Sequence, residues 1–203
     1  MCATCVADMP RLTPPYCVVC SRPGTDHWCV WCKAMPMAVN GIRAPFLYVG
    51  SSLIQKALND FKFHNVRAMA LELARHLADY LASHPMPCDV IVPVPSHPRR
   101  LRSRGFNQAA LLGRELGALI DMPVDEKLLA KVKNTPSQLR MNSPEERWRN
   151  VEGSFGCDGD VGGKAVLLID DIATTGGTMS ACAAALKDAG ASKVWGLVVA
   201  RAP

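Results

Sequence analysis

The sequence has no apolar run long enough to cross a lipid bilayer. Its longest apolar stretches, near residues 90–94 and 196–200, are far shorter than the roughly 20 residues that a membrane-spanning helix needs. The amino-terminal residues do not combine a basic start with an apolar run. No secretory signal is therefore predicted, and a cytoplasmic location is expected.

Internal repeats and low-complexity tracts are also absent, and only 20% of the 203 residues are charged. Hydrophobic residues make up 49% of the chain, which is typical of a globular protein and excludes a disordered one. A chain of this length can form one sizeable domain with a smaller appendage.

Positive charge is unevenly distributed along the chain, whose formal net charge is +5. Residues 97–150 hold eleven Lys and Arg against six Asp and Glu, while residues 1–96 and 151–203 carry +2 and −2. An anionic partner is therefore expected to meet the middle segment. A solvated basic surface without a partner is the alternative.

Cysteine is abundant and clustered: six of the nine cysteines lie before residue 33, in three Cys-x-x-Cys pairs. Two of these pairs are separated by eight residues and can together supply a tetrahedral set of four thiolates, which suits a structural zinc ion. The predicted ligands are Cys17, Cys20, Cys29 and Cys32. Reduced cysteines in a small core are the alternative. His27 could replace one of the ligands, but it is interpreted as a solvated side chain. Cys88, Cys157 and Cys182 have no such spacing and are interpreted as small buried hydrophobic residues.

The chain divides into two parts. Residues 1–38, rich in Cys and Pro, form the predicted metal-stapled module, and Arg43 to Gly50 join it to the rest. In residues 39–203, segments with apolar residues at helical spacing alternate with short apolar runs typical of strands. Helices are expected near 51–61, 66–81, 107–120 and 178–189, and strands near 89–94, 165–169 and 193–200. This alternation predicts an α/β domain with a Rossmann-like, mainly parallel sheet and helices on both faces.

The most informative segment runs from Val166 to Thr178. A short apolar run, typical of a strand buried on both faces, leads directly into Asp170 and Asp171. A Thr/Gly turn follows and opens onto a helix amino terminus, where unpaired N–H groups favour an anion such as phosphate. The carboxylates suit hydroxyl groups, or a Mg²⁺ ion that phosphates also bind. A ribose phosphate satisfies both halves, whereas the alternative is a helix cap beside solvated acids.

Two further segments carry chemistry. The first is a predicted loop, Ser96–Gln108, with four arginines that suit pyrophosphate or a nucleic-acid backbone: Arg99, Arg100, Arg102 and Arg104. An ordinary basic surface loop is the alternative. The second, residues 135–155, is either a mobile flap or base-stacking surface, or an ordinary helix capped by Ser143 with Trp148 packed on it.

The segment from Asp170 to Thr178 matches the phosphoribosyl pyrophosphate (PRPP) loop of type I phosphoribosyltransferases. The resemblance implies that Asp170 and Asp171 face the ribose hydroxyls and that the turn wraps the 5′-phosphate of a PRPP molecule bound with Mg²⁺. The turn residues are Ala173, Thr174, Thr175, Gly176, Gly177 and Thr178.

Nearly the whole chain closely resembles the ComF/GntX family. The marks of this resemblance are the runs at 104–108, 146–151 and 170–176 and the step Thr135-x-x-Gln138, all behind a cysteine-rich module. The resemblance implies a phosphoribosyltransferase fold, an amino-terminal zinc module and a role in handling imported DNA. Longer family members often carry a further upstream cysteine pair. Cys2 and Cys5 are therefore interpreted as the remnant of a truncated start, as free thiols, or as sharing the later site.

Two classes of function follow. The first is a PRPP-binding protein of DNA uptake, which uses its basic segment and zinc module to hold single-stranded DNA and contacts the uptake machinery. The second is an active phosphoribosyltransferase of nucleobase salvage. No residue set in the sequence selects a purine or a pyrimidine acceptor.

Overall fold

The computed structural model describes residues 3–63, 67–133 and 143–203. Within its helices, the side chains of a few residues lie outside this description. They are Ala3, Phe63, Arg100, Ser103, Arg104, Pro144 and Arg147. None of the described helices is both long enough and apolar enough to cross a membrane.

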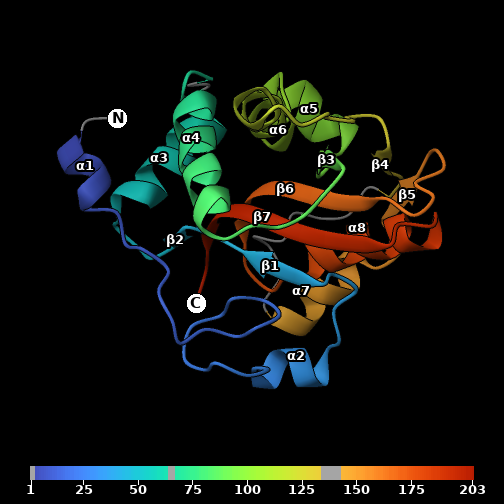
Figure 1. Ribbon diagram of the computed structural model, residues 1–203, viewed down its shortest axis with the longest axis horizontal. Helices are drawn as coiled ribbons and strands as arrows, with labels where there is room; N and C mark the ends of the chain where they lie inside the picture. Colours follow the sequence, from blue (N-terminus) through green and yellow to red (C-terminus); the bar gives the residue numbers. More distant parts are fainter. Residues whose placement is uncertain (1–2, 64–66, 134–142) are drawn as a thin grey trace.

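A parallel sheet forms the centre of the molecule (Figure 1). Its strands are β1 (Gly41–Arg43), β2 (Phe46–Leu47), β3 (Val90–Pro93), β6 (Ala165–Ala173) and β7 (Lys193–Arg201). The order across the sheet is β1-β7-β6-β3, and β2 pairs with β7 beyond the end of β1. The segment predicted to join the two parts of the chain therefore becomes an edge of this sheet. A second, antiparallel pair is formed by β4 (Leu129–Lys131) and β5 (Phe155–Cys157).

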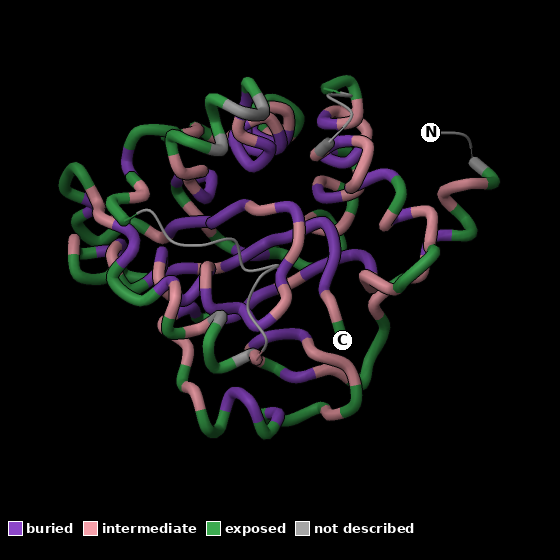
Figure 2. The backbone as a smooth tube through the Cα atoms, turned by 180° about the vertical axis from the view of Figure 1, so that it is seen from behind, coloured by how far each residue is buried: buried purple, intermediate pink, exposed green. Residues whose placement is uncertain are grey.

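The two faces of the sheet are covered by different helices. Alternate residues of β6 divide between them, because successive side chains of a strand point to opposite faces. Leu167 and Ile169 pack with α3 (Leu53–Phe63), α4 (Met69–Ser83) and α6 (Gln108–Ile120). Val166 and Leu168 pack with α8 (Gly177–Asp188), which is flanked by α7 (Pro144–Val151) and the small β4–β5 sheet. The strands consequently lie in the buried centre of the molecule (Figure 2).

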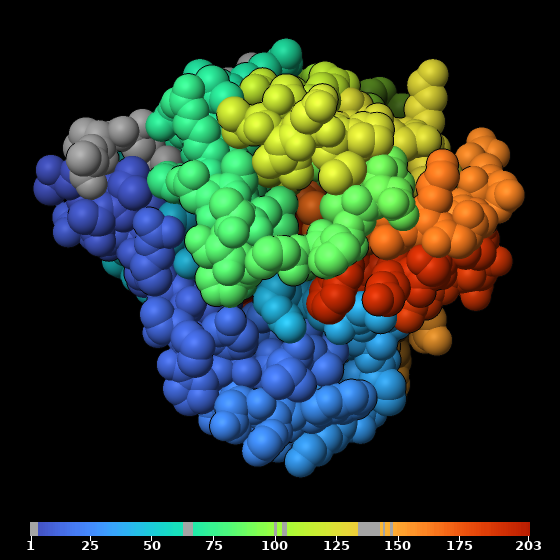
Figure 3. Space-filling model, viewed as in Figure 1, coloured from blue at the N-terminus to red at the C-terminus, as the bar shows by residue number. Residues whose placement is uncertain are grey.

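The cysteine-rich module packs against the edge of the sheet at β1. It contains the short helix α2 (Val30–Ala34), while α1 (Ala3–Ala7) lies apart near α3 and α4 (Figure 1). The backbone N–H of Ile42 donates to Val19, and the Ser21 hydroxyl donates to the Ile42 carbonyl at 2.6 Å. In the space-filling view, the amino-terminal residues form the lower part of one continuous surface (Figure 3).

The predicted α/β architecture is confirmed, and the expected helices and strands lie within a few residues of the observed ones. Two expectations are wrong. The strand expected to stop at Ile169 continues to Ala173, because β7 still pairs with it there. The arginine-rich segment is the helix α5 (Pro98–Arg104) rather than a loop, since His97 caps its start and Gly105 ends it at φ +77°.

Candidate functional site

Asp170 and Asp171 lie where β6 loses one of its two neighbours. The pairing of β3 with β6 ends at Pro93 opposite Ile169, whereas the pairing with β7 continues past Asp170, which lies opposite Val198. The two acids therefore lie next to the space beyond the carboxyl end of β3. Crevices of this kind are where parallel α/β sheets bind ligands.

The two acids point to opposite faces of the sheet. Asp171 follows the alternation of Leu167 and Ile169 toward α3, where its carboxylate forms an ion pair of 2.9 Å with Lys62. Asp170 points to the other face and accepts a hydrogen bond of 2.8 Å from the Asp171 N–H. Burial raises the pKa of the Asp170 carboxyl to about 7, and the neighbouring charge of Asp171 adds to this shift.

Sequence reasoning missed Lys62 as part of this site. The pairing joins residues more than a hundred positions apart, and the side chain is largely buried at 18% exposure. A basic residue directly after the predicted helix at 51–61, which the observed helix α3 includes in its last turn, is the only signal that the sequence offers. Its effect is to place a cation beside a carboxylate predicted to bind ribose.

The predicted phosphate loop, residues 173–178, turns from β6 into α8 and depends on glycine. Gly176 caps α8 at φ +82°, and a Cβ atom there would approach Met37 Cε to 2.7 Å. A Cβ on Gly177 would lie 3.3 Å from the Cα atom of Trp148 in α7. The loop is thus held between the cysteine-rich module and α7.

The polar groups of this loop are divided between its two sides. Three consecutive carbonyls accept hydrogen bonds from outside the loop: those of Ala173 and Thr174 from Arg201, and that of Thr175 from the Trp31 indole. The N–H groups of Thr174, Thr175 and Gly176 make no hydrogen bond to the part of the chain that the structure describes. Such a row of free N–H groups before a helix is an anion-binding arrangement.

Two groups predicted to contact a phosphate instead bond each other in this structure. The hydroxyl of Thr175, which is 3% exposed, accepts from the N–H of Gly177 at 3.3 Å. Thr174 and Thr178 are half-buried.

The four predicted zinc ligands come together in one buried cluster. Their Sγ atoms all lie within 4.8 Å of one another, with 3.8 Å between Cys17 and Cys32 and 3.7 Å between Cys20 and Cys29. A tetrahedron with Zn–S bonds of about 2.3 Å has edges of about 3.8 Å, so this arrangement fits a zinc ion. The N–H of Cys29 also donates to Cys17 Sγ at 3.3 Å, as the outer-sphere donors of thiolate sites do. A cluster closed in this way is suited to a structural metal.

The remaining metal-binding candidates lie elsewhere. The imidazole of His27 is 86% exposed beside Asp26, as expected for a solvated side chain. Cys2 lies outside the described residues, and Cys5, which is half-buried, is not among the residues of the cluster. Of the three cysteines expected to be buried, Cys182 is, whereas Cys88 and Cys157 are half-buried.

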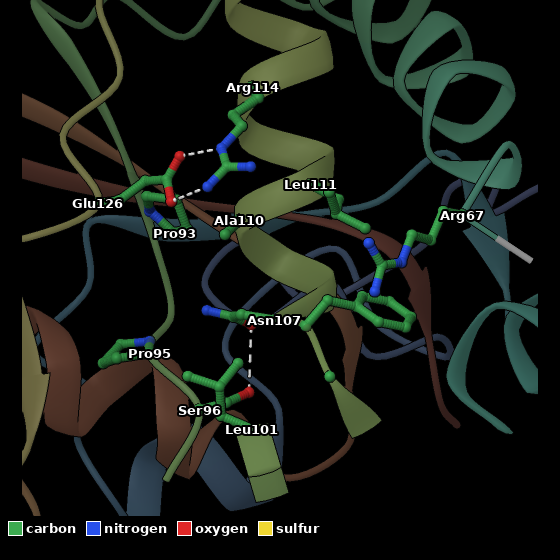
Figure 4. Close-up of a pocket in the computed structure, with 12 residues that line it drawn as sticks. Arg67, Pro93, Pro95, Ser96, Leu101, Asn107, Ala110, Leu111, Arg114 and Glu126 are labelled. Atoms are coloured by element: carbon green, nitrogen blue, oxygen red, sulfur yellow. Dashed lines mark hydrogen bonds and ion pairs between the residues drawn. The ribbon is translucent and has the colours of Figure 1, made fainter. Parts of the chain in front are cut away.

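The basic segment lies at the same edge of the sheet, because α5 follows the carboxyl end of β3. Arg99 and Arg102 are exposed on α5, whereas the side chains of Arg100 and Arg104 lie outside the described residues. A cavity of about 420 Å³ opens between β3, α5 and α6 (Figure 4). Its lining includes neither Asp170 nor Asp171, so the acid pair is not part of this cavity.

Two pairs of polar side chains line this cavity. The Ser96 hydroxyl donates to Asn107, and Arg114 pairs with Glu126 (Figure 4). The Arg67 guanidinium lies 5.0 Å from the centre of the Phe106 ring.

The third chemistry-bearing segment is only partly described. Thr135 and Gln138 lie outside the described residues. From Ser143 onward the segment is the capped helix that was one of the alternatives, with the Ser143 hydroxyl accepting from the Glu146 N–H at 3.1 Å. Trp148 is half-buried and meets Trp31 edge to face, with 6.1 Å between ring centres. It is therefore packed into the protein rather than offered as a stacking platform.

The chain is similar to one family model and to curated bacterial proteins. The family model described as the phosphoribosyl transferase domain matches residues 109–203, which include β6, the loop and α8. Competence protein F of Haemophilus influenzae is 32% identical over 157 residues, covering 72% of this chain and 66% of that protein. The DNA utilization protein YhgH of Salmonella typhi is 32% identical over 143 residues, covering 68% of this chain and 62% of that protein. The chain thus spans about two thirds or less of the length of these relatives.

Among solved structures, the chain is similar to a glutamine PRPP amidotransferase from B. subtilis in complex with ADP and GMP. The identity is 22% and the TM-score 0.45, over 64% of this chain and 26% of that one.

Proposed function

The chain belongs to the ComF-like family of proteins with a phosphoribosyl transferase domain, and we propose that it binds Mg²⁺-PRPP in the service of DNA uptake or utilisation. The names of the relatives, competence protein F and DNA utilization protein YhgH, support the biological role. The reducing cytoplasm is the expected location, because it keeps a cluster of four thiolates available for zinc.

One observation carries the proposal for PRPP. The acids at 170–171 are followed by a loop whose carbonyls accept hydrogen bonds from Arg201 and Trp31, while three successive N–H groups make no hydrogen bond to the described residues. A ligand that suits both features carries hydroxyl groups for the carboxylates and a phosphate for the N–H groups. A ribose 5-phosphate unit has this composition.

The other end of PRPP requires positive charge for its pyrophosphate. A bound Mg²⁺ ion would supply charge neutralisation there. The arginines of α5 lie at the same sheet edge and can bind phosphate oxygens with two N–H groups each. We assign this role to Arg99, Arg100, Arg102 and Arg104.

The substitution Asp171→Asn tests the PRPP site. It removes the charge that would hold a ribose hydroxyl while keeping the shape of the side chain, so the affinity for Mg²⁺-PRPP is expected to fall at least tenfold, the usual effect of losing a charged hydrogen bond of about 1.5–3 kcal/mol. Calorimetric titration of the zinc-loaded protein measures this affinity.

Asp188→Asn is the matched control, because Asp188 is exposed at the far end of α8. It should bind as the wild type does, and thermal unfolding should show that both variants fold. Equal affinity of Asp171→Asn and Asp188→Asn would contradict the assignment of the acids.

Handling of single-stranded DNA is the second part of the proposal, supported by the net charge of +5 on residues 97–150. Phosphate contacts release counterions, so binding to an oligonucleotide should weaken steeply between about 50 and 200 mM salt. Fluorescence anisotropy at several salt concentrations measures this slope. Absence of binding even at low salt would remove the DNA role and leave the PRPP site untouched.

An active phosphoribosyltransferase of nucleobase salvage is the second candidate function. The intact pair of acids favours it, because catalysis needs the ribose fixed while its bond to pyrophosphate breaks. Release of pyrophosphate when a panel of nucleobases is added to the zinc-loaded protein with Mg²⁺-PRPP would establish it. PRPP binding without release from any base would reject it.

A further inference from the structure

Arg201 connects the cysteine cluster to the phosphate loop. It stands at the end of β7, and its side chain is fully buried. Its Nε donates to the Cys20 carbonyl at 2.6 Å, and Nη2 lies 3.6 Å from Cys20 Sγ. Its Nη1 donates to the carbonyls of Ala173, at 3.1 Å, and Thr174. One guanidinium therefore contacts a predicted metal ligand and two peptides of the loop.

Trp31 makes a second, independent connection. It belongs to α2 and lies between two of the clustered cysteines, Cys29 and Cys32. Its indole N–H donates to the Thr175 carbonyl at 3.1 Å, and the side chain is 8% exposed. The ring is held from the other side by Trp148, at 6.1 Å between centres.

These bonds determine where the loop's N–H groups point. A trans peptide is planar, with its C=O and the following N–H on opposite sides. Fixing the carbonyls of residues 173, 174 and 175 therefore aims the N–H groups of residues 174, 175 and 176 away from the cysteine cluster. These are the same three N–H groups that remain unbonded within the described residues.

The charge of the cysteine cluster affects how well the buried Arg201 guanidinium is stabilised. A fully buried guanidinium is costly unless an opposite charge lies beside it. Four thiolates around one Zn²⁺ ion would leave a net negative charge next to Arg201. A bound metal would therefore stabilise the guanidinium that holds two of the loop's carbonyls.

We propose that Arg201 and Trp31 are positioning residues through which the metal site preorganises the phosphate loop, so that metal binding and phosphate binding strengthen each other. This inference rests on the proposed PRPP site. Because coupling between two binding equilibria is reciprocal, PRPP must raise the affinity for zinc by the same factor by which zinc raises the affinity for PRPP.

The deciding variant is Trp31→Phe, which removes the indole N–H and keeps an aromatic ring in the module. Loss of one hydrogen bond to the loop is expected to weaken Mg²⁺-PRPP binding about three- to tenfold. Trp28→Phe is the matched control, because Trp28 lies in the same module and is 50% exposed. Calorimetry of the zinc-loaded 203-residue proteins gives the PRPP affinities.

The second measurement is the zinc affinity itself, obtained by competition with a chromophoric chelator with and without saturating Mg²⁺-PRPP. In the wild type and in Trp28→Phe, PRPP should tighten zinc binding about threefold or more, and this gain should shrink in Trp31→Phe. Arg201→Lys keeps the charge, but its single ammonium cannot contact both Cys20 and the loop carbonyls. In this variant PRPP should therefore raise the zinc affinity even less than it does in Trp31→Phe. A purely structural role for these residues would change stability without changing the effect of PRPP on zinc.

The outcomes separate the two proposals. If the wild type binds PRPP but Trp31→Phe matches Trp28→Phe in both measurements, the coupling is wrong and the PRPP site stands. If the wild type does not bind PRPP, the proposed function fails and the coupling fails with it. If Arg201→Lys does not fold, Trp31→Phe alone decides.

Discussion

At the scale of residues, two carboxylates that are neighbours in sequence have different surroundings. Asp171 lies beside the Lys62 ammonium, whereas Asp170 lies on the other face of β6. Burial and the charge of Asp171 raise the pKa of Asp170 to about 7. The folded protein therefore holds a proton on Asp170 at pH values where the unfolded chain, with its ordinary carboxyl, has already released it.

This difference predicts a pH-dependent effect of Asp170→Asn. Since the folded-state pKa is raised, the free energy of unfolding contributed by this group falls as the pH rises from about 4 to about 7. Asparagine removes that loss, so the variant should exceed the wild type in stability by on the order of 4 kcal/mol at pH 8 and by little at pH 4. Urea unfolding at the two pH values measures the difference. An equal difference at both would show that Asp170 ionises normally in the folded protein.

Residue roles could be predicted where they follow from local spacing. The two cysteine pairs and the two acids are each a few positions apart, so their chemistry is visible in the sequence. Lys62 and Trp31 act across separations of more than a hundred residues, and Arg201 joins Cys20, 181 positions away, to Ala173, 28 positions away. Only the folding of β7 beside β6, and of the module beside the loop, brings them into contact.

At the scale of elements, the strands and helices of the domain follow from apolar periodicity, but two boundaries do not. Carboxylates lower the local hydropathy, which is why a strand end was expected before Asp170, although backbone pairing with β7 continues through Ala173. Four arginines suggested a loop, yet capping by His97 and Gly105 makes α5 a helix. Caps and neighbouring strands, rather than composition, determine these boundaries.

The extension of β6 has a consequence for the site. It brings Ala173 opposite Arg201 in the ladder, and the Ala202 N–H donates to the Ala173 carbonyl at 2.9 Å. The start of the loop is therefore part of the sheet. A loop anchored in this way requires less ordering when a ligand binds, which favours affinity.

At the scale of the whole molecule, the cysteine-rich module is integrated with the sheet. Met37 packs under Gly176, and the Ala38 N–H donates to Ser180 in α8 at 2.9 Å. Removal of zinc is therefore expected to destabilise the entire chain and not the module alone. At a free zinc concentration of about 1,000 times the Kd, bound metal contributes about 4 kcal/mol.

Thermal unfolding with and without a strong chelator tests this expectation. With the chelator, circular dichroism should show a lower Tm for the helical signal of the sheet domain. Re-addition of zinc should restore the original Tm. Cys32→Ser should melt like the chelated protein whether or not zinc is present. A Tm of the helical signal that is insensitive to chelator would mean that the module and the domain are stabilised separately.

The central claim is that the acids at 170–171 and the loop behind them bind a 5-phosphorylated ribose, and a crystal structure of the zinc-loaded protein with ribose 5-phosphate tests it most directly. The account predicts the phosphate within hydrogen-bond distance of the N–H groups of Thr174, Thr175 and Gly176, with ribose hydroxyls at the two carboxylates. Sugar phosphate bound in the cavity beside α6, with the loop empty, would contradict it.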